Sequence, residues 1–387
     1  MNTIERDNTY VAHSYKRFQV ELTHGKGSLV YDVNGKEYID LGSGIGVTSL
    51  GLCDDVWAAA VAEQASKLQH MSNLYYTEPC TLLAEHLCER TGMKRVFFSN
   101  SGAEANECLI KAMRKYAAEK KGAEYSTIIT LVNSFHGRTL TTLAATGQDH
   151  FHELFQPLTP GFISVPANDL DAMKNAVDAN KVAGILIETI QGEGGVIALA
   201  EDFVRGIAKL CEENDIIFGV DEVQTGNGRT GKFYSYEHYG VKPDVVSTAK
   251  GLGGGLPLGA TLLGEKVADV FGYGDHGSTF GGNPVCCAGA LSIVKRIDDA
   301  LLAEVTEKSN YIKSELEGAP GVESVSGRGL MLGIKTLKPA SEVVAACMEN
   351  GVLPLTAKEK VRLLPALNIP MDVLKRAVAV IKQACAE

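Results

Sequence analysis

Features that would point to a membrane or a nucleic acid are missing from the sequence. No stretch approaches the roughly 20 continuous apolar residues of a membrane helix. The N-terminal segment MNTIERDNTYVAHSYKRF lacks the apolar core of a signal peptide. A formal net charge of −10, without any run of lysine or arginine, argues against nucleic acid and an anionic membrane surface as partners.

Cysteine spacings typical of a disulfide framework or a metal site are also missing. The nine cysteines are scattered, odd in number and without any CxxC pair. This pattern is typical of reduced thiols in a cytosolic protein, and it fits neither a disulfide framework nor a zinc site. We therefore expect a cytoplasmic protein, with the adjacent pair Cys286–Cys287 filling space in the core.

Short apolar runs alternate with helical patterns in the middle of the chain. Such runs are typical of strands covered on both faces, so we expect an α/β fold with a mostly parallel sheet flanked by helices. The predicted strands are RVFF (95–98), TIITLV (127–132), VAGILIE (182–188), IIFGVDE (216–222) and DVVSTAK (244–250), and the predicted helices include FVRGIAKLCEEN (203–214) and the segment after RVFF, with Ala105, Leu109, Ala112 and Met113 on its apolar stripe.

The two ends of the chain have a different pattern. Residues 19–40 alternate as strands do and contain the turn signal Asn34-Gly35. From about residue 295 onward, helical patterns alternate with short strands. A chain of 387 residues exceeds one ordinary core. We predict a large domain at 48–292 and a small domain built from 1–47 and 293–387.

The motif SNSGAEANE (99–107) lies between a predicted strand and a predicted helix. Backbone N–H groups and the helix dipole at such a helix start attract a phosphate. The alternative is a helix cap without a ligand, in which Ser101 is the N-cap and Glu104 completes a capping box. Taken alone, the motif leaves both interpretations open.

Two further motifs follow apolar strands. Asp221 in VDEVQTG stands at the carboxyl end of its strand, where open α/β sheets bind ligands. Its carboxylate suits a protonated heterocycle, a general base, or magnesium shared with Glu222. Lys250 in STAKGLGGGLPLGA precedes a glycine-rich stretch that permits close approach of a planar group. The residue order fits neither a phosphate loop nor a dinucleotide fingerprint.

These motifs meet at one rim of a doubly wound sheet. SFHGRTL (134–140) adds Arg138, whose guanidinium suits a carboxylate or a surface ion pair. GSTFGGNP (277–284) is a turn-rich loop. A lysine, a carboxylate and a phosphate cup are the groups that pyridoxal 5'-phosphate requires.

The motifs SNSGAEANE, FHGRTL, ETIQGEGG, VDEVQTGNGRTGK, TAKGLGGGLPLGA and HGSTFGGNP together resemble the class III pyridoxal-phosphate aminotransferases of the acetylornithine type. The resemblance covers nearly the whole chain. It implies the fold-type I architecture of aspartate aminotransferase and a homodimer with its active site at the subunit interface. Asn227 is unusual in TGNGRTG, and we interpret it as a turn residue.

The resemblance also implies roles for residues around the cofactor. Lys250 would form the Schiff base and then move the proton, and Asp221 would keep the pyridine nitrogen protonated. The other predicted cofactor contacts are Gln224 near the phenolic oxygen, Phe135 against the ring, Ser101, Gly102 and Ala103 around the phosphate, and Ser278 with Thr279, of which Thr279 reaches the partner's cofactor.

For the substrates, the resemblance implies transfer of the distal amino group of N2-acetylornithine to 2-oxoglutarate, a step of arginine biosynthesis. Arg138 would bind the acetylornithine α-carboxylate and Arg362 that of 2-oxoglutarate. Glu193 would cover Arg362 in the first half-reaction and swing away in the second. Tyr15 matches a tyrosine that ornithine enzymes use near the α-amino group.

Other substrates and activities stay open at this point. Ornithine, succinylornithine, γ-aminobutyrate and putrescine enzymes share the ring-binding residues. Gly44-Ile45 leaves room for an acyl group, which favours acetylornithine. A glutamate-1-semialdehyde aminomutase, a non-catalytic module of the same fold and a magnesium enzyme are the remaining alternatives.

Overall fold

The computed structural model describes residues 1–387, and its centre is a seven-stranded sheet ordered β4-β12-β11-β10-β7-β5-β6. The strands are β4 (Arg95–Ser99), β5 (Thr127–Leu131), β6 (Phe162–Val165), β7 (Val182–Ile187), β10 (Ile217–Asp221), β11 (Val245–Thr248) and β12 (Gly259–Leu263). Only β12 runs antiparallel to its neighbours. The predicted α/β class with a mostly parallel sheet is confirmed, and each predicted strand lies within two residues of its expected ends.

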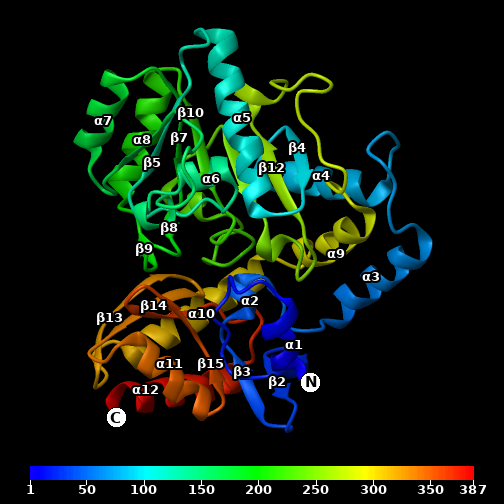
Figure 1. Cartoon of the computed structure of the whole chain (residues 1–387), viewed down its shortest axis with the longest axis vertical. Helices are drawn as coiled ribbons and strands as arrows, with labels where there is room; N and C mark the ends of the chain where they lie inside the picture. The colour runs from blue at the N-terminus through cyan, green and yellow to red at the C-terminus, as the bar shows by residue number, and fades with distance from the viewer.

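Helices cover both faces of this sheet, as Figure 1 shows. The buried positions of α5 include the four predicted stripe residues, and α8 buries one face through Phe203, Val204, Ile207 and Cys211. The helices of this part are α3 (Asp55–Lys67), α4 (Glu78–Thr91), α5 (Gly102–Lys120), α6 (Leu140–Ala145), α7 (Leu170–Ala179), α8 (Glu201–Glu213) and α9 (Pro284–Val294).

Short elements connect the strands and helices of this part. The pair β8 (Ile190–Gln191) and β9 (Ile197–Ala198) brackets the glycine-rich loop that carries Glu193. The one-turn helices are η1 (Asp149–Phe151), η2 (Ser235–Tyr239), η3 (Lys250–Leu252) and η4 (Glu265–Val267).

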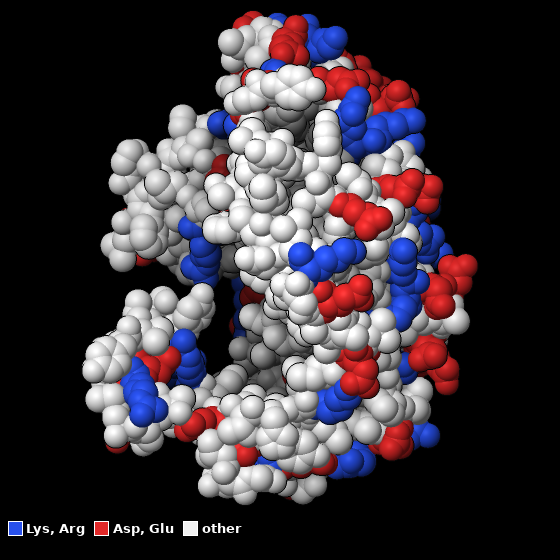
Figure 2. Space-filling view, turned by 90° about the vertical axis from the view of Figure 1, so that its right-hand side faces the viewer, with Lys and Arg blue, Asp and Glu red and all other residues white.

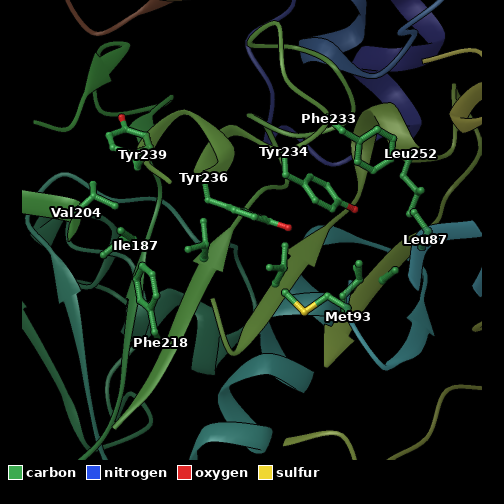
Figure 3. Close-up of a cluster of buried hydrophobic side chains, with 14 of the residues drawn as sticks. Leu87, Met93, Ile187, Val204, Phe218, Phe233, Tyr234, Tyr236, Tyr239 and Leu252 are labelled. Atoms are coloured by element: carbon green, nitrogen blue, oxygen red, sulfur yellow. The ribbon is translucent and has the colours of Figure 1, made fainter. Parts of the chain in front are cut away.

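Aromatic side chains around η2 fill the space between the sheet and α4. Phe233, Tyr234 and Tyr239 are fully buried and belong to a cluster of 37 buried apolar residues. Figure 3 shows Tyr239 above Phe218 of β10 and Phe233 beside Leu252 of η3. The loop after β10 is therefore anchored in the core, which holds the carboxyl edge of the sheet in place.

The two ends of the chain meet in the lower body of Figure 1. Strand β15 pairs in parallel with β3, so one sheet joins residues far apart in sequence. The elements are α1 (Thr3–Tyr10), β1 (Leu22–Lys26), β2 (Leu29–Asp32), β3 (Glu37–Asp40), α2 (Ser43–Gly46), α10 (Asp299–Leu316), β13 (Val322–Arg328), β14 (Met331–Thr336), α11 (Ala340–Glu349), β15 (Val352–Leu353), β16 (Leu355–Ala357), β17 (Lys360–Leu363) and α12 (Met371–Ala386).

The apolar cores of the two bodies are separate. A cluster of 24 buried residues contains Ile39 and Leu41 together with residues from Val305 to Cys385, and none from between. We propose on this basis that the predicted boundaries, 48–292 against 1–47 with 293–387, divide the chain into its two domains. No helix is both long and apolar enough to cross a membrane, and all nine cysteines are free thiols.

Candidate active site

A cavity of about 540 Å³ opens at the carboxyl edge of the central sheet, which is within the usual size of a small-molecule site. Its walls come from the segments that follow β4, β5, β7, β10 and β11. Eight of the residues predicted from the sequence line it: Ser101, Gly102, Ala103, Phe135, Arg138, Asp221, Gln224 and Lys250. Strands that are neighbours in the sheet thus bring together residues from distant motifs.

The N-terminus of α5 forms one wall. Ser101 is the N-cap, and its Oγ accepts from the backbone N–H of Glu104 at 3.2 Å. Glu104 reaches the N–H of Asn100 at 2.7 Å, one residue before the position of a capping box. Gly102 lies so close to the loop after β10 that an added Cβ would be 2.7 Å from Val223 Cγ1. The first-turn N–H groups have no partners within the helix, so this end suits an anion.

Asp221 is buried at the far side of the cavity, with its Oδ2 held by two neighbours. Asn106 Nδ2 donates to it at 2.7 Å, and His136 Nδ1 lies 2.8 Å away. Ser247 Oγ donates to Asn106 Oδ1 at 2.6 Å and fixes that amide. The remaining Asp221 oxygen accepts from the N–H of Val223 at 2.9 Å. A carboxylate fixed in this way suits a cationic ring nitrogen.

The sequence did not identify three buried residues that line the cavity: Asn106, His136 and Glu188. Asn106 lies four residues after Gly102, which places both on one face of α5. Glu188 follows β7, the strand beside β10, and accepts from the N–H of Phe135 at 2.9 Å. Burial raises the pKa of Glu188 to about 7. A buried carboxyl at the end of the neighbouring strand is the signal that could have revealed it.

Lys250 follows β11 and lines the cavity. Burial lowers the pKa of its ammonium group, and the nearby charge of Glu193 opposes that shift. A lysine with a lowered pKa is more often present as the neutral amine, which is the nucleophilic form.

An ion pair between the buried Arg362 and the half-buried Glu193 lies near this lysine. Arg362 Nη1 donates to Glu193 Oε1 at 2.5 Å and to Gln224 Oε1 at 3.2 Å. Gln224 Nε2 in turn donates to Glu193 Oε1 at 3.3 Å. Burial alone would raise the pKa of Glu193, but the charge of Arg362 holds it below its ordinary value. The predicted Glu193–Arg362 pair is therefore present, with Gln224 joining it to the cavity wall.

Arg138 projects from the cavity wall without an acidic partner. Its guanidinium carbon lies 3.9 Å from the centroid of the Phe151 ring and 5.4 Å from that of Phe135. The chain contains no ion pair to Arg138, so its fork of donors is free for a carboxylate from outside.

Five predicted residues do not line the cavity: Glu193 and Arg362, which Gln224 joins to its wall, and Ser278, Thr279 and Tyr15. Ser278 touches its edge through Asn100, whose Nδ2 donates to Ser278 Oγ at 3.1 Å, and Thr279 is exposed. Tyr15 is 74% exposed on the N-terminal segment, where Arg17 lies over its ring. This chain alone therefore does not bring Thr279 or Tyr15 to the other site residues.

The two adjacent acids after β10 face different partners. Glu222 accepts from Thr225 Oγ1 at 2.6 Å and from the N–H of Tyr236 at 2.9 Å, on the core side of the strand. Asp221 instead faces Asn106 and His136. No group of three or more His, Cys, Asp or Glu side chains is arranged to hold a metal ion.

The model of the family described as aminotransferase class III matches residues 10–385. The chain belongs to this family. Its members use pyridoxal 5'-phosphate, so the chain is a transaminase that depends on that cofactor, as the motifs predicted.

Individual relatives extend over nearly the whole chain. It is 49% identical to an acetylornithine aminotransferase of Haemophilus ducreyi, covering 98% of each chain. Among solved structures, the ornithine aminotransferase of Toxoplasma gondii gives a TM-score of 0.95 at 31% identity, covering 99% of this chain and 94% of the other. The N-acetylornithine aminotransferase of Stenotrophomonas maltophilia gives 0.86 at 34%, covering 99% and 98%. These likenesses confirm the fold-type I architecture.

Proposed function

We propose that the protein transfers the distal amino group of N2-acetylornithine to 2-oxoglutarate, giving N-acetylglutamate 5-semialdehyde and glutamate in arginine biosynthesis. The observation that carries this proposal is the Glu193–Arg362 pair beside Lys250. An enzyme that accepts two different carboxylic acids needs an acceptor site that can be covered and uncovered. The name of the Haemophilus ducreyi relative supports the choice of donor.

The residues around the cavity fit pyridoxal 5'-phosphate. Ser101, Gly102 and Ala103 would hold its phosphate at the start of α5, where a side chain on Gly102 would crowd Val223. Asp221 would hold the ring nitrogen, Phe135 would lie against the ring, and Gln224 would bind near the phenolic oxygen. When bound, the cofactor supplies an aldehyde that takes up the amino group and a ring that withdraws electrons.

The chain's own groups would then handle protons and charge. Lys250 would hold the cofactor through its amine and would also act as the general base that moves the proton. Asp221, oriented by Asn106 and His136, would keep its negative charge aimed at the ring. Arg138 would bind the donor α-carboxylate and so leave the distal amino group near Lys250.

Arg362 would bind the acceptor only after Glu193 leaves it. Arg362 is 3% exposed, and a buried guanidinium without a counter-ion is costly. Glu193 satisfies it while the amino donor is bound. In the second half-reaction a carboxylate of 2-oxoglutarate would replace Glu193, which would move aside with the loop between β8 and β9.

We also propose a homodimer in which Thr279 reaches the cofactor of the partner subunit. Thr279 is exposed, although its neighbour Ser278 contacts the cavity edge. The predicted role of Tyr15 would likewise require a change in the N-terminal segment or a contribution from a second subunit. The nine free thiols support the proposed location in the cytoplasm.

A substrate panel tests the proposal. Purified protein is given N2-acetylornithine, succinylornithine, ornithine and γ-aminobutyrate in turn, with 2-oxoglutarate, and glutamate is measured. We expect the highest kcat/KM for acetylornithine. A higher value for ornithine would move the assignment to the activity named for the Toxoplasma gondii structure.

Three measurements on the same purified protein test the remaining alternatives. An aminomutase would form no stable pyridoxamine form with an amino donor, whereas a transaminase does. A chelator should leave the rate unchanged if Asp221 and Glu222 hold no magnesium. A non-catalytic module would form no glutamate at all.

A further inference from the structure

The backbone at Lys250 has an unusual conformation. Its φ angle is +44°, in the left-handed region that residues with a Cβ rarely adopt. The preceding residue, Ala249, has φ −164° and ψ −143°. A turn of this kind persists only where surrounding groups hold it.

Two buried side chains hold the carbonyl groups of the residues before and after Lys250. Asn227 Nδ2 donates to the carbonyl oxygen of Ala249 at 3.3 Å and to Thr248 Oγ1 at 3.0 Å. Ser49 Oγ donates to the carbonyl oxygen of Gly251 at 3.2 Å. Asn227 and Ser49 are both buried, so bulk water cannot take over these bonds.

Asparagine is unfavourable at position 227 if its only role is to form a turn. Its own φ is +56°, which glycine would adopt with less strain. Its Oδ1 is buried without a partner in the protein, which costs free energy. The amide is favourable at this position because of its donor, and that donor points to the two residues before Lys250.

We propose that Asn227, with Ser49, is a positioning residue for Lys250: the two side chains fix the turn from which the lysine enters the cavity. This inference rests on the role proposed above for Lys250. Ser49 extends the link further, because its carbonyl oxygen accepts from the N–H of Leu367, shortly after the strand that carries Arg362.

The variant Asn227→Gly distinguishes a positioning residue for Lys250 from a simple turn residue. Glycine keeps the left-handed turn and removes only the amide. We expect kcat to fall about fivefold to tenfold with little change in KM, the effect of one hydrogen bond lost from a reacting group's support. In the apoenzyme, the pH midpoint for Schiff-base formation between Lys250 and added pyridoxal phosphate should rise. A less tightly held lysine is less desolvated, and its pKa returns toward the ordinary value.

Asn168→Gly is the matched control. Asn168 also has a left-handed backbone, with φ +63°, but lies outside the cavity, and its side chain accepts from the N–H of Ala200. We expect wild-type kcat and an unchanged pH midpoint. Ser49→Ala removes the second bond and should shift both quantities in the same direction as Asn227→Gly, which gives a second test if the glycine variant folds poorly.

The outcomes are distinguishable. A wild type without a borohydride-fixed label at Lys250 would overturn the proposed function and this inference with it. A labelled, active wild type with unchanged kcat and pH midpoint in Asn227→Gly would overturn the inference alone and leave Asn227 a turn residue. If Asn227→Gly does not fold, an unchanged Ser49→Ala has the same consequence.

Discussion

At the scale of single residues, the central question is how one cavity serves two different acids. Arg138 is exposed and free of ion pairs, whereas Arg362 is buried against Glu193. The first arginine can bind a carboxylate at once. The second must first exchange one carboxylate for another. If the proposed function holds, the two arginines would therefore affect different halves of the reaction.

We predict that Arg362→Ala slows the half-reaction with 2-oxoglutarate by about 100-fold, the loss expected for a charge-assisted bidentate bond. The half-reaction with acetylornithine should change far less. Single-turnover absorbance measurements of each half-reaction provide the check. Arg138→Ala is the matched control and should give the opposite pattern. If Arg362→Ala slowed both half-reactions equally, the result would contradict the gating role of Glu193.

The sequence predicted most of the residues that the structure brings together around the cavity, but not how they are supported. Lys250 and Asp221 stand at strand ends in motifs that identify them. The contacts of Asp221 with Asn106 and His136 join segments 115 and 85 residues away. Such contacts depend on strand order, and a single sequence does not contain that order. Tyr15 shows the converse, since a matching motif did not bring its side chain to the cavity of this chain.

At the scale of elements, Gly102 determines how closely α5 approaches the loop after β10. We predict that Gly102→Ala weakens cofactor binding about tenfold or more, because its Cβ would be 2.7 Å from Val223 Cγ1 and would displace the helix start. Equilibrium titration of the apoenzyme measures this. Val223→Ala in the same chain should restore much of the affinity, and a double variant as weak as the single one would argue against a steric cause.

Glu222 joins the end of β10 to η2 and gives this connection a pH dependence. Burial raises its pKa to about 7, from an ordinary value of 4.5. Between these values the folded chain keeps a proton that the unfolded chain has lost. The stability contributed by this group is therefore complete below pH 4.5 and declines as pH rises toward 7.

The variant Glu222→Gln should therefore gain stability relative to the wild type on going from pH 5 to pH 8, by up to about 3 kcal/mol from the linkage relation. Urea unfolding at the two pH values measures the difference. Glu237→Gln, an exposed acid in the same turn, is the control for a general change of charge. The difference in free energy of unfolding between Glu222→Gln and the wild type could also be the same at both pH values. That result would indicate that the carboxyl does not titrate in this range.

At the scale of the whole molecule, the elements that a short stretch of sequence specifies were the easiest to predict. Each strand of the central sheet could be recognised from a short apolar run, because both of its faces are buried. The pairing of β15 with β3 joins residues more than 300 positions apart. No local pattern specifies it, so the sequence suggested that both ends share a body without showing how they pair.

The surface of the whole molecule has an uneven distribution of charge. Charged side chains crowd the right-hand edge of Figure 2, whereas its upper left-hand part is largely white. Exposed apolar side chains also gather beside the cavity: Leu74 and Tyr76 project from one segment and Phe280 from the loop that contains Thr279. Asn73 ties the two segments together, donating to the carbonyl oxygens of Ser278 and Gly281. Such a patch is typical of a surface that another protein covers.

We predict that Tyr76, which is fully exposed in the single chain, is buried between two subunits. Tyr76→Asp should then weaken dimerisation by about 30-fold or more, as loss of a buried aromatic anchor does, and activity should fall with dilution. Sedimentation over a range of concentrations measures the fractions of monomer and dimer. Leu337→Asp, a similarly exposed side chain in the turn after β14, should leave the dimer intact. Because Thr279 reaches no cavity in its own chain, a wild type that is active as a monomer would remove the need for a second subunit.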